Sequence, residues 1–256
     1  MNKVKKENNK TTWGNVAGWY DELLSGDDTY QSKVILPNLL RLVAPRGKRV
    51  IDIACGQGYF SKALTEAGAT VLGIDISPNL ITIAEKSKSD SLSFAVSPAH
   101  TISQAQSSSF DVAVIVLALQ NIKEMSETLK EAARVLVSSG KLILVLNHPC
   151  FRIPKESSWG FDEKENVQYR RLDSYNSSSS AEMDMNPGQK TDKVKTTSFH
   201  KPLQDYFKAL SSAGFVVTGL EEWISHKKSE EGPRSQAEDT ARKEFPLFLT
   251  IVAQKQ

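Results

Sequence analysis

The sequence lacks the features that mark several classes of protein. It has only two cysteines, Cys55 and Cys150, too few for a disulfide-rich secreted scaffold, so we expect a cytoplasmic protein. Residues 1–12 are polar and slightly basic with no apolar run behind them, which argues against a signal peptide and predicts a disordered tail. No apolar run approaches the length of a membrane span, so no membrane partner is expected.

A strong charge of one sign is also absent. The formal net charge is +2, and no stretch of lysine and arginine is dense enough to predict a nucleic-acid surface. No cluster of side chains has the spacing of a metal site, so no metal is expected. Hydrophobic residues make up 39% of the 256 residues, which is low but sufficient for the core of one domain with an insertion.

The most informative part of the sequence lies between residues 49 and 76. Val50, Ile51 and Ile53 form a short apolar run typical of a buried strand, and Gly56 and Gly58 follow it. Glycines allow a tight turn and let backbone amides approach a ligand. A second apolar run ends on a carboxylate, Asp75. At the end of a neighbouring strand, such a carboxylate can accept hydrogen bonds from a ribose diol.

Apolar segments alternate with helical patterns along much of the chain, which predicts an α/β fold with a doubly wound, mostly parallel sheet. The expected strands are 49–54, 70–75, 92–96, 110–117, 141–147, 215–223 and 245–253. The expected helices lie within 13–45 and at 58–67, 79–87, 126–137 and 201–212. Segments 168–175 and 193–200 have β-like patterns that predict one antiparallel ribbon, whereas 226–243 is charged and predicts an exposed loop.

Residues 52–58 read Asp-Ile-Ala-Cys-Gly-Gln-Gly, which resembles motif I of the class I S-adenosylmethionine-dependent methyltransferases. A dinucleotide-binding oxidoreductase shares the pattern of strand, glycines and acid. It fits less well, because the bulky Tyr59 and Phe60 would lie beneath a pyrophosphate and because the strand carries Asp52. The resemblance runs from about residue 20 to residue 255. It implies a Rossmann-like seven-stranded sheet with an antiparallel last strand.

The resemblance also implies a cofactor, S-adenosylmethionine, with S-adenosylhomocysteine as its product. In this family the strand acid, here Asp52, helps to hold the methionyl amino end, and the acid that closes the second strand, here Asp75, binds the ribose hydroxyls. The family's Asp-Ala pair after the third strand is replaced by Ser97-Pro98-Ala99, and proline offers neither a charge nor an amide hydrogen. The expected cofactor contacts are Asp52, Ala54, Gly56, Gly58, Asp75, Ile76, Ser97, Ala99 and Tyr20.

The expected organisation has four parts. Residues 1–12 form the tail, 13–147 the N-terminal helices and the cofactor-binding half, 148–200 an insertion, and 201–256 the C-terminal part of the methyltransferase domain. The insertion is too long for a plain connection. In small-molecule members of the family, an insertion after strand five forms a lid over the acceptor, so a β-rich lid is expected.

His148 and His200 are the candidate catalytic residues. His148 follows the strand at 141–147, at the edge where open α/β sheets bind ligands, and His200 closes the insertion. Either could orient an acceptor or take its proton. Asn147-His148-Pro149 resembles part of a motif of methyltransferases that act on nucleic-acid bases. It follows the wrong strand and lacks the rest of that motif, so no nucleic-acid partner is expected.

Together these features predict in-line transfer of a methyl group from S-adenosylmethionine to a small-molecule acceptor, at oxygen, nitrogen or carbon. Two alternatives stay open at this point. One is an NAD(P)-dependent oxidoreductase, and the other is a non-catalytic protein that binds S-adenosylmethionine. The expected assembly is a monomer or a homodimer.

Overall fold

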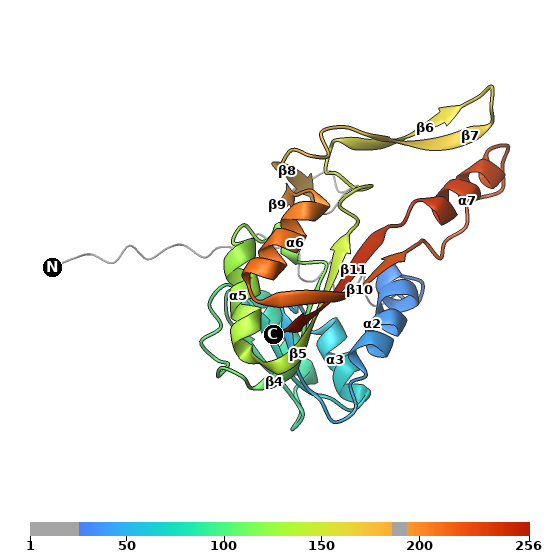
Figure 1. The fold of residues 1–256 in the computed structure, drawn as a ribbon. Coiled ribbons are helices and arrows are strands. Elements are labelled where there is room, and N and C mark those ends of the chain that lie inside the picture. Colours follow the sequence, from blue (N-terminus) through green and yellow to red (C-terminus); the bar gives the residue numbers. More distant parts are fainter. Residues whose placement is uncertain (1–25, 186–193) are drawn as a thin grey trace.

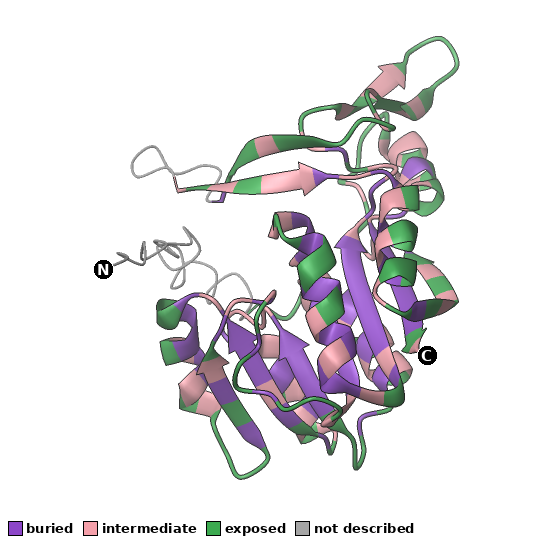
Figure 2. Cartoon of the chain, turned by 60° about the vertical axis from the view of Figure 1, so that its left-hand side comes forward, coloured by how far each residue is buried: buried purple, intermediate pink, exposed green. Residues whose placement is uncertain are grey.

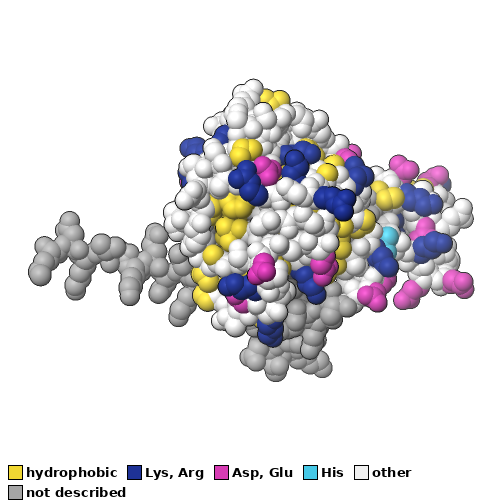
Figure 3. Space-filling model, turned by 90° about the horizontal axis from the view of Figure 1, so that it is seen from below, with side chains coloured by type: hydrophobic (Ala, Val, Ile, Leu, Met, Phe, Trp, Pro, Cys, Tyr) yellow, Lys and Arg dark blue, Asp and Glu magenta, His cyan; other side chains and the backbone are white. Residues whose placement is uncertain are grey.

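The computed structural model describes residues 26–185 and 194–256. The predicted tail at 1–12, the beginning of the first predicted helix and Tyr20 lie outside the described residues. Within the described part, no helix combines the length and apolarity needed to cross a membrane. On the face shown in Figure 3, acidic and basic side chains are interspersed.

The centre of the molecule is a seven-stranded sheet with the order β10-β11-β5-β4-β1-β2-β3 (Figure 1). Strands β1 to β5 run parallel, and β11 runs antiparallel to both of its neighbours. The predicted Rossmann-like sheet with an antiparallel last strand is therefore confirmed. The strands are Arg49–Ile53 (β1), Thr70–Asp75 (β2), Leu92–Val96 (β3), Phe110–Val116 (β4), Leu136–Asn147 (β5), Phe215–Trp223 (β10) and Phe248–Lys255 (β11).

Helices cover both faces of this sheet. One face packs against η2 (Gln31–Ile35), α2 (Leu36–Val43), α3 (Tyr59–Glu66) and α4 (Pro78–Ala84), the last of which continues into η3 (Glu85–Ser87). The other face packs against α5 (Met125–Val135) and α6 (Leu203–Ser212). A further short helix, η4 (Leu119–Asn121), follows β4. Helix α4 begins one residue before the predicted helix at 79–87, because the Ser77 side chain caps it ahead of a proline at its first position.

Alternation along the central strands sends successive side chains into the two core layers. On β1, Val50 belongs to the layer of α2 and α3, and Ile51 belongs to the layer of α5 and α6. Both are fully buried, and burying a side chain of this size contributes about 1.5–3 kcal/mol. Figure 2 shows this buried centre in purple. The parallel strands end together at one edge of the sheet, and that edge carries the polar residues considered below.

The insertion contains two ribbons, which corrects the single ribbon predicted from the sequence. Strand β6 (Ser157–Asp162) pairs with β7 (Val167–Leu172), and β8 (Ser179–Asp184) pairs with β9 (Lys195–His200), in two separate two-stranded sheets. An alternating pattern shows that a segment is a strand but does not name its partner. Each strand pairs with the segment nearest in sequence, which costs the least loop-closure entropy.

The charged segment at 226–243 is not an exposed loop throughout, so that prediction is wrong. It contains a helix, α7 (Ser235–Glu244), in which Ala241 is the one buried residue. A helix with so little apolar surface has no periodic pattern that the sequence can reveal. Tertiary contacts hold it: Arg234, at its N-cap, forms an ion pair with Glu163 and lies over the Phe161 ring.

The predicted strand at 141–147 begins earlier, at Leu136. The register with β4 shifts between Phe110, opposite Leu136, and Val112, opposite Lys141, so the extra residues form a bulge. Ser139 has a φ of 61° within it. The gap between the predicted helix at 126–137 and the predicted strand at 141–147 is thus part of an irregular beginning of β5.

Candidate active site

The turn between β1 and α3 is the first component of the site. Ala54, Gly56 and Gly58 all have positive φ angles, of 61°, 59° and 83°. A side chain added at Gly56 would meet no atom within 4 Å, so this face of the turn is open. A side chain at Gly58 would instead come within 2.7 Å of the Phe94 ring. The two glycines therefore have different roles: Gly56 leaves space for a ligand, and Gly58 allows close packing of the fold.

Asp75, at the end of β2, is held by two backbone amides. Its Oδ2 accepts a hydrogen bond from Gly56 N at 3.0 Å, and its Oδ1 accepts one from Ser77 N at 2.8 Å. Burial raises the pKa of this carboxyl group, while the amide bonds oppose that effect. Each oxygen keeps a lone pair, so the fixed carboxylate can accept hydrogen bonds from a diol.

Asp52 lies deeper, on β1, and is 1% exposed. Desolvation raises its pKa to about 7, and the nearby charge of Asp75 adds to the effect. The Ser61 hydroxyl donates to Asp52 Oδ2 at 2.6 Å and opposes the shift. The carboxyl group therefore titrates near neutrality, and a cation placed beside it would favour its charged form.

These groups border a cavity of about 150 Å³, which we call the first cavity. Its lining comes from the β1–α3 turn, the end of β2 and the segment that follows β4. Gln57 is part of the lining, and its Nε2 is buried with no hydrogen-bond partner among the described residues. Burying an unpaired amide is costly, so this group is suited to a ligand that accepts its hydrogen bond. Of the predicted cofactor contacts, those in the lining are Asp52, Ala54, Gly56, Asp75 and Ile76.

The other predicted contacts are not in this lining. Gly58 packs against Phe94, as described above. Ser97 is buried, and its hydroxyl donates to Thr101 O at 3.1 Å. Ser97 and Ala99 follow β3, next to the strand that carries Asp75, yet neither borders the first cavity. The apolar residues that do border it include Ile76, Leu80 and Ile122.

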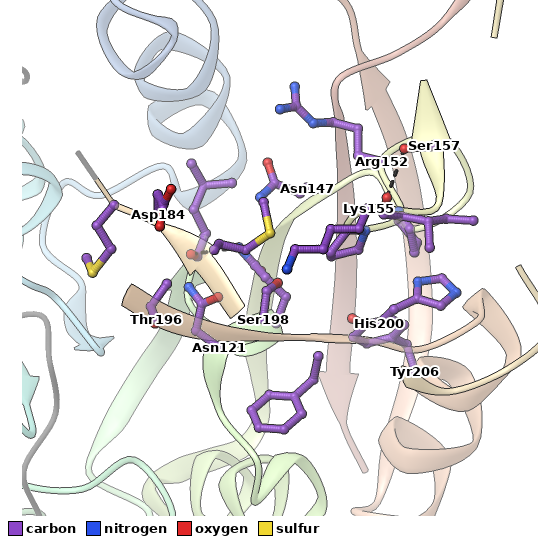
Figure 4. A pocket seen from close by; sticks show the side chains of 18 of the residues that line it. Asn121, Asn147, Arg152, Lys155, Ser157, Asp184, Thr196, Ser198, His200 and Tyr206 are labelled. Carbon is purple, nitrogen blue, oxygen red and sulfur yellow. Dashed lines mark hydrogen bonds between the residues drawn. The ribbon is translucent and has the colours of Figure 1, made fainter. Parts of the chain in front are cut away.

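A second cavity, of about 460 Å³, lies between the end of the sheet and the insertion (Figure 4). The ends of β4 and β5 contribute Gln120, Asn121 and Asn147. The segment 149–157, both ribbons and α6 supply the remaining walls. The insertion thus forms most of the enclosure.

Leu117 and Asn121 border both cavities. Leu117 has a φ of 52°, in the left-handed region that bulky residues rarely adopt. Its N–H donates to Val145 O at 2.7 Å, which ties the strained residue to β5. Backbone strain of this kind is concentrated at functional sites. The two cavities therefore meet at the carboxyl end of β4.

The structure separates the two candidate histidines. His148 is 2% exposed and borders neither cavity. Its Nδ1 accepts a hydrogen bond from Cys150 N at 3.2 Å, and its Nε2 lies 2.7 Å from Glu222 Oε1. Burial lowers the pKa of His148, and Glu222 opposes that effect. With both nitrogens engaged inside the protein, His148 is placed to position the loop after β5.

His200 does border the second cavity, and its Nε2 donates to Tyr175 O at 2.8 Å. Nδ1 is then the atom left to accept a proton. In Figure 4, His200 and Tyr206 lie on the side of the cavity away from Asn121. A catalytic role for either histidine stays a prediction. Sequence reasoning missed Asn121, Gln57 and Leu117; the clue available for Asn121 was its place just after a central strand.

Comparison with known proteins adds independent information. A family model described as "Methyltransferase domain" matches residues 51–144. The chain is 29% identical over 103 residues to a ubiquinone biosynthesis O-methyltransferase of Xanthomonas axonopodis pv. citri, covering 39% of this chain and 43% of that protein. It is 32% identical over 106 residues to a demethylmenaquinone methyltransferase of Renibacterium salmoninarum, covering 41% and 44%. The chain thus spans less than half the length of these curated relatives.

Among solved structures, a protein from Listeria monocytogenes, assigned provisionally to the S-adenosylmethionine-dependent methyltransferases, is similar with a TM-score of 0.66. It is 26% identical, and the similarity covers 86% of this chain and 97% of that one. An S-adenosylmethionine-dependent methyltransferase from Mesorhizobium loti shares the fold, with a TM-score of 0.68, 23% identity and coverage of 90% and 99%.

Residues 51–144 thus match a methyltransferase domain, and the chain as a whole has the fold of class I S-adenosylmethionine-dependent methyltransferases. The cofactor of this methyltransferase family is S-adenosylmethionine, and the first cavity fits it. Asp75 offers fixed acceptors for a ribose diol, and Gly56 leaves open space beside them. Gln57 has an unpaired donor, and Asp52 has a carboxyl group whose charge an amino group would stabilise. The dinucleotide alternative finds no comparable support in these relatives.

Proposed function

We propose that this protein transfers a methyl group from S-adenosylmethionine to a small-molecule acceptor bound in the second cavity. The observation that carries the proposal is that the two cavities share Leu117 and Asn121 in their linings. Ligands bound in the two cavities would contact each other at these residues. In an in-line displacement, the donor and the nucleophile must approach along one line, and a shared wall supports that arrangement.

When bound, S-adenosylmethionine supplies a methyl group on a cationic sulfur, so an attacking oxygen, nitrogen or carbon forms the new bond as the carbon–sulfur electron pair returns to sulfur. The protein contributes position and exclusion of water. Asp75 and the Gly56 turn would hold the nucleoside, and Asp52 would hold the amino end. Asn121 would contact the reacting part of the acceptor, with its amide oxygen able to accept a hydrogen bond from a nucleophilic O–H or N–H.

The insertion, rather than the sheet, would select the acceptor. Most of the second cavity is enclosed by residues 149–200 and α6, whereas the sheet contributes its ends. The family's chemistry depends on the cofactor half, so acceptor choice can vary with the insertion while the reaction stays the same. His200, on the far side of the cavity, is then better placed to contact the body of the acceptor than its reacting atom.

Calorimetric titration of S-adenosylhomocysteine tests the cofactor half of the proposal. We expect micromolar binding to the wild type, and Asp75→Ala should weaken it by about 1–3 kcal/mol, the cost of unmade hydrogen bonds to a charged group. Asp90→Ala is the matched control, because Asp90 is an exposed acid in the turn before β3. Absence of binding to the wild type, together with binding of a nicotinamide dinucleotide, would contradict the proposal.

A further inference from the structure

One wall of the second cavity carries an excess of positive charge. Arg152, Lys155 and Arg170 border it, and the one acidic residue among the described lining residues is Asp184. Figure 4 shows Asp184 on the opposite side of the cavity from Arg152 and Lys155. The three cations come from the segment after β5 and from β7, so the fold of the insertion brings them together.

Arg152 has no counterion in the described structure. Its guanidinium forms no hydrogen bond or ion pair, although its side chain remains accessible from solvent. Desolvation by the surrounding protein lowers the pKa of Arg152. An accessible guanidinium without a partner among the described residues is available to bind an anion.

Arg170 is fixed beside Arg152. Its Nε donates to Phe151 O at 2.9 Å, its Nη2 donates to Ser157 Oγ at 2.8 Å, and its guanidinium lies over the Trp159 ring. After desolvation, the charge of Arg152 is the next influence that lowers the pKa of Arg170. Two guanidinium groups near each other, one of them held in place, form a preorganised site for an oxyanion.

Near the junction of the two cavities, the lining offers a hydrogen-bond acceptor instead of a cation. Gln120 is 8% exposed, and its Nε2 donates to Leu117 O at 2.8 Å. Its Oε1 is buried and has no partner among the described residues. This oxygen can accept a hydrogen bond from a ligand O–H or N–H. The lining of the same cavity also contains apolar side chains, among them Ile153, Met183, Met185 and Phe199.

We propose that the acceptor is an amphipathic small anion. Its carboxylate or phosphate binds Arg152 with Arg170 and Lys155 around it, its apolar body lies along the middle of the cavity, and its O–H or N–H donor reaches Gln120 and Asn121. The inference deepens the proposed function and rests on it, because it assigns the chemistry of the acceptor for the same site.

Calorimetric titration of three matched probes tests this assignment, in the presence of saturating S-adenosylhomocysteine and again without it. The probes are para-hydroxyphenylacetate, para-hydroxyphenyl phosphate and the neutral para-hydroxyphenylacetamide. We expect the better of the two anions to bind about tenfold more tightly than the amide, a difference of about 1.4 kcal/mol. The order of the two anions then identifies the oxyanion that the site prefers.

The variants make the test specific. Arg152→Gln should remove the advantage of the anion and leave amide binding unchanged. Arg171→Gln removes the same charge from β7, the strand that also carries Arg170, but Arg171 pairs with Asp173 and borders neither cavity, so it should change nothing. Three results would overturn the inference. They are equal affinities of the wild type for the amide and the anions, an anion advantage that Arg152→Gln retains, and no anion binding at millimolar concentration. Failure of the proposed function is a separate result, namely loss of S-adenosylhomocysteine binding while the anions still bind.

Discussion

At the residue scale, Asp52 has the environment with the clearest thermodynamic consequence. Its pKa is raised to about 7 in the folded protein, against 3.8 as the ordinary value. The folded state therefore holds a proton between those two pH values that the unfolded state has lost. It follows that the free energy of unfolding falls as pH rises through this window, and Asp52 destabilises the protein above it.

Asp52→Asn removes the charge and keeps the shape. We expect the variant to match the wild type near pH 4 and to be more stable by a few kcal/mol at pH 8, because the buried charge is gone. Thermal unfolding followed by circular dichroism at a series of pH values measures the difference. The same variant should bind S-adenosylhomocysteine more weakly, because a neutral amide does not attract its amino group. A stability difference that does not depend on pH would contradict this account of Asp52.

The two glycines of the turn give opposite predictions. Gly58→Ala places a methyl group against the Phe94 ring at a positive φ, so we expect a loss of about 1–3 kcal/mol of stability with little change in cofactor affinity. Gly56→Ala meets open space, so it should cost only the strain of its backbone angle, about 1–2 kcal/mol, but fill part of the first cavity and weaken binding.

Denaturant unfolding and S-adenosylhomocysteine titration of both variants compare these effects directly. The account requires the larger stability loss in Gly58→Ala and the larger affinity loss in Gly56→Ala. Reversal of that order would show that the roles of the two glycines have been exchanged.

At the scale of elements, the sheet and the ribbons should differ in stability. The central strands are buried on both faces, whereas β6, β7 and β8 have mostly exposed or partly exposed residues in two-stranded sheets. Two-stranded ribbons are marginal on their own. We expect hydrogen exchange at their amides to be faster than exchange in β1, β4 and β5.

Hydrogen exchange with and without S-adenosylhomocysteine extends this prediction. A para-hydroxyphenyl anion should protect the ribbons, which S-adenosylhomocysteine alone should not protect. Protection of the ribbons by S-adenosylhomocysteine alone would contradict the division of the site into two cavities.

The helices and strands also differ in whether the sequence could predict them. The parallel strands could be predicted, because burial on both faces requires continuous apolar runs such as residues 112–116. The pairing of the ribbons could not, because alternation specifies a strand without its partner. Helix α7 could not either, since its one buried residue, Ala241, leaves no apolar period and its place depends on contacts with β7.

At the scale of the whole molecule, the two cavities differ in how far the sequence alone could predict them. Asp52, Gly56 and Asp75 lie within one βαβ unit, so spacing along the chain was enough to place them together. The second cavity brings together Leu117, the segment 149–157 and Tyr206, which are far apart in sequence. No local pattern predicts such a juxtaposition, and His148, which its position in sequence favoured, lies outside both linings.

The most direct test of the central claim is a crystal structure of the complex with S-adenosylhomocysteine. The account predicts the ribose hydroxyls against Asp75, the amino end toward Asp52, and the sulfur facing Leu117 and Asn121, where the two cavities meet. A ligand whose ribose lies away from Asp75, or whose sulfur points away from the second cavity, would contradict the claim that the methyl group passes between the cavities at the end of β4.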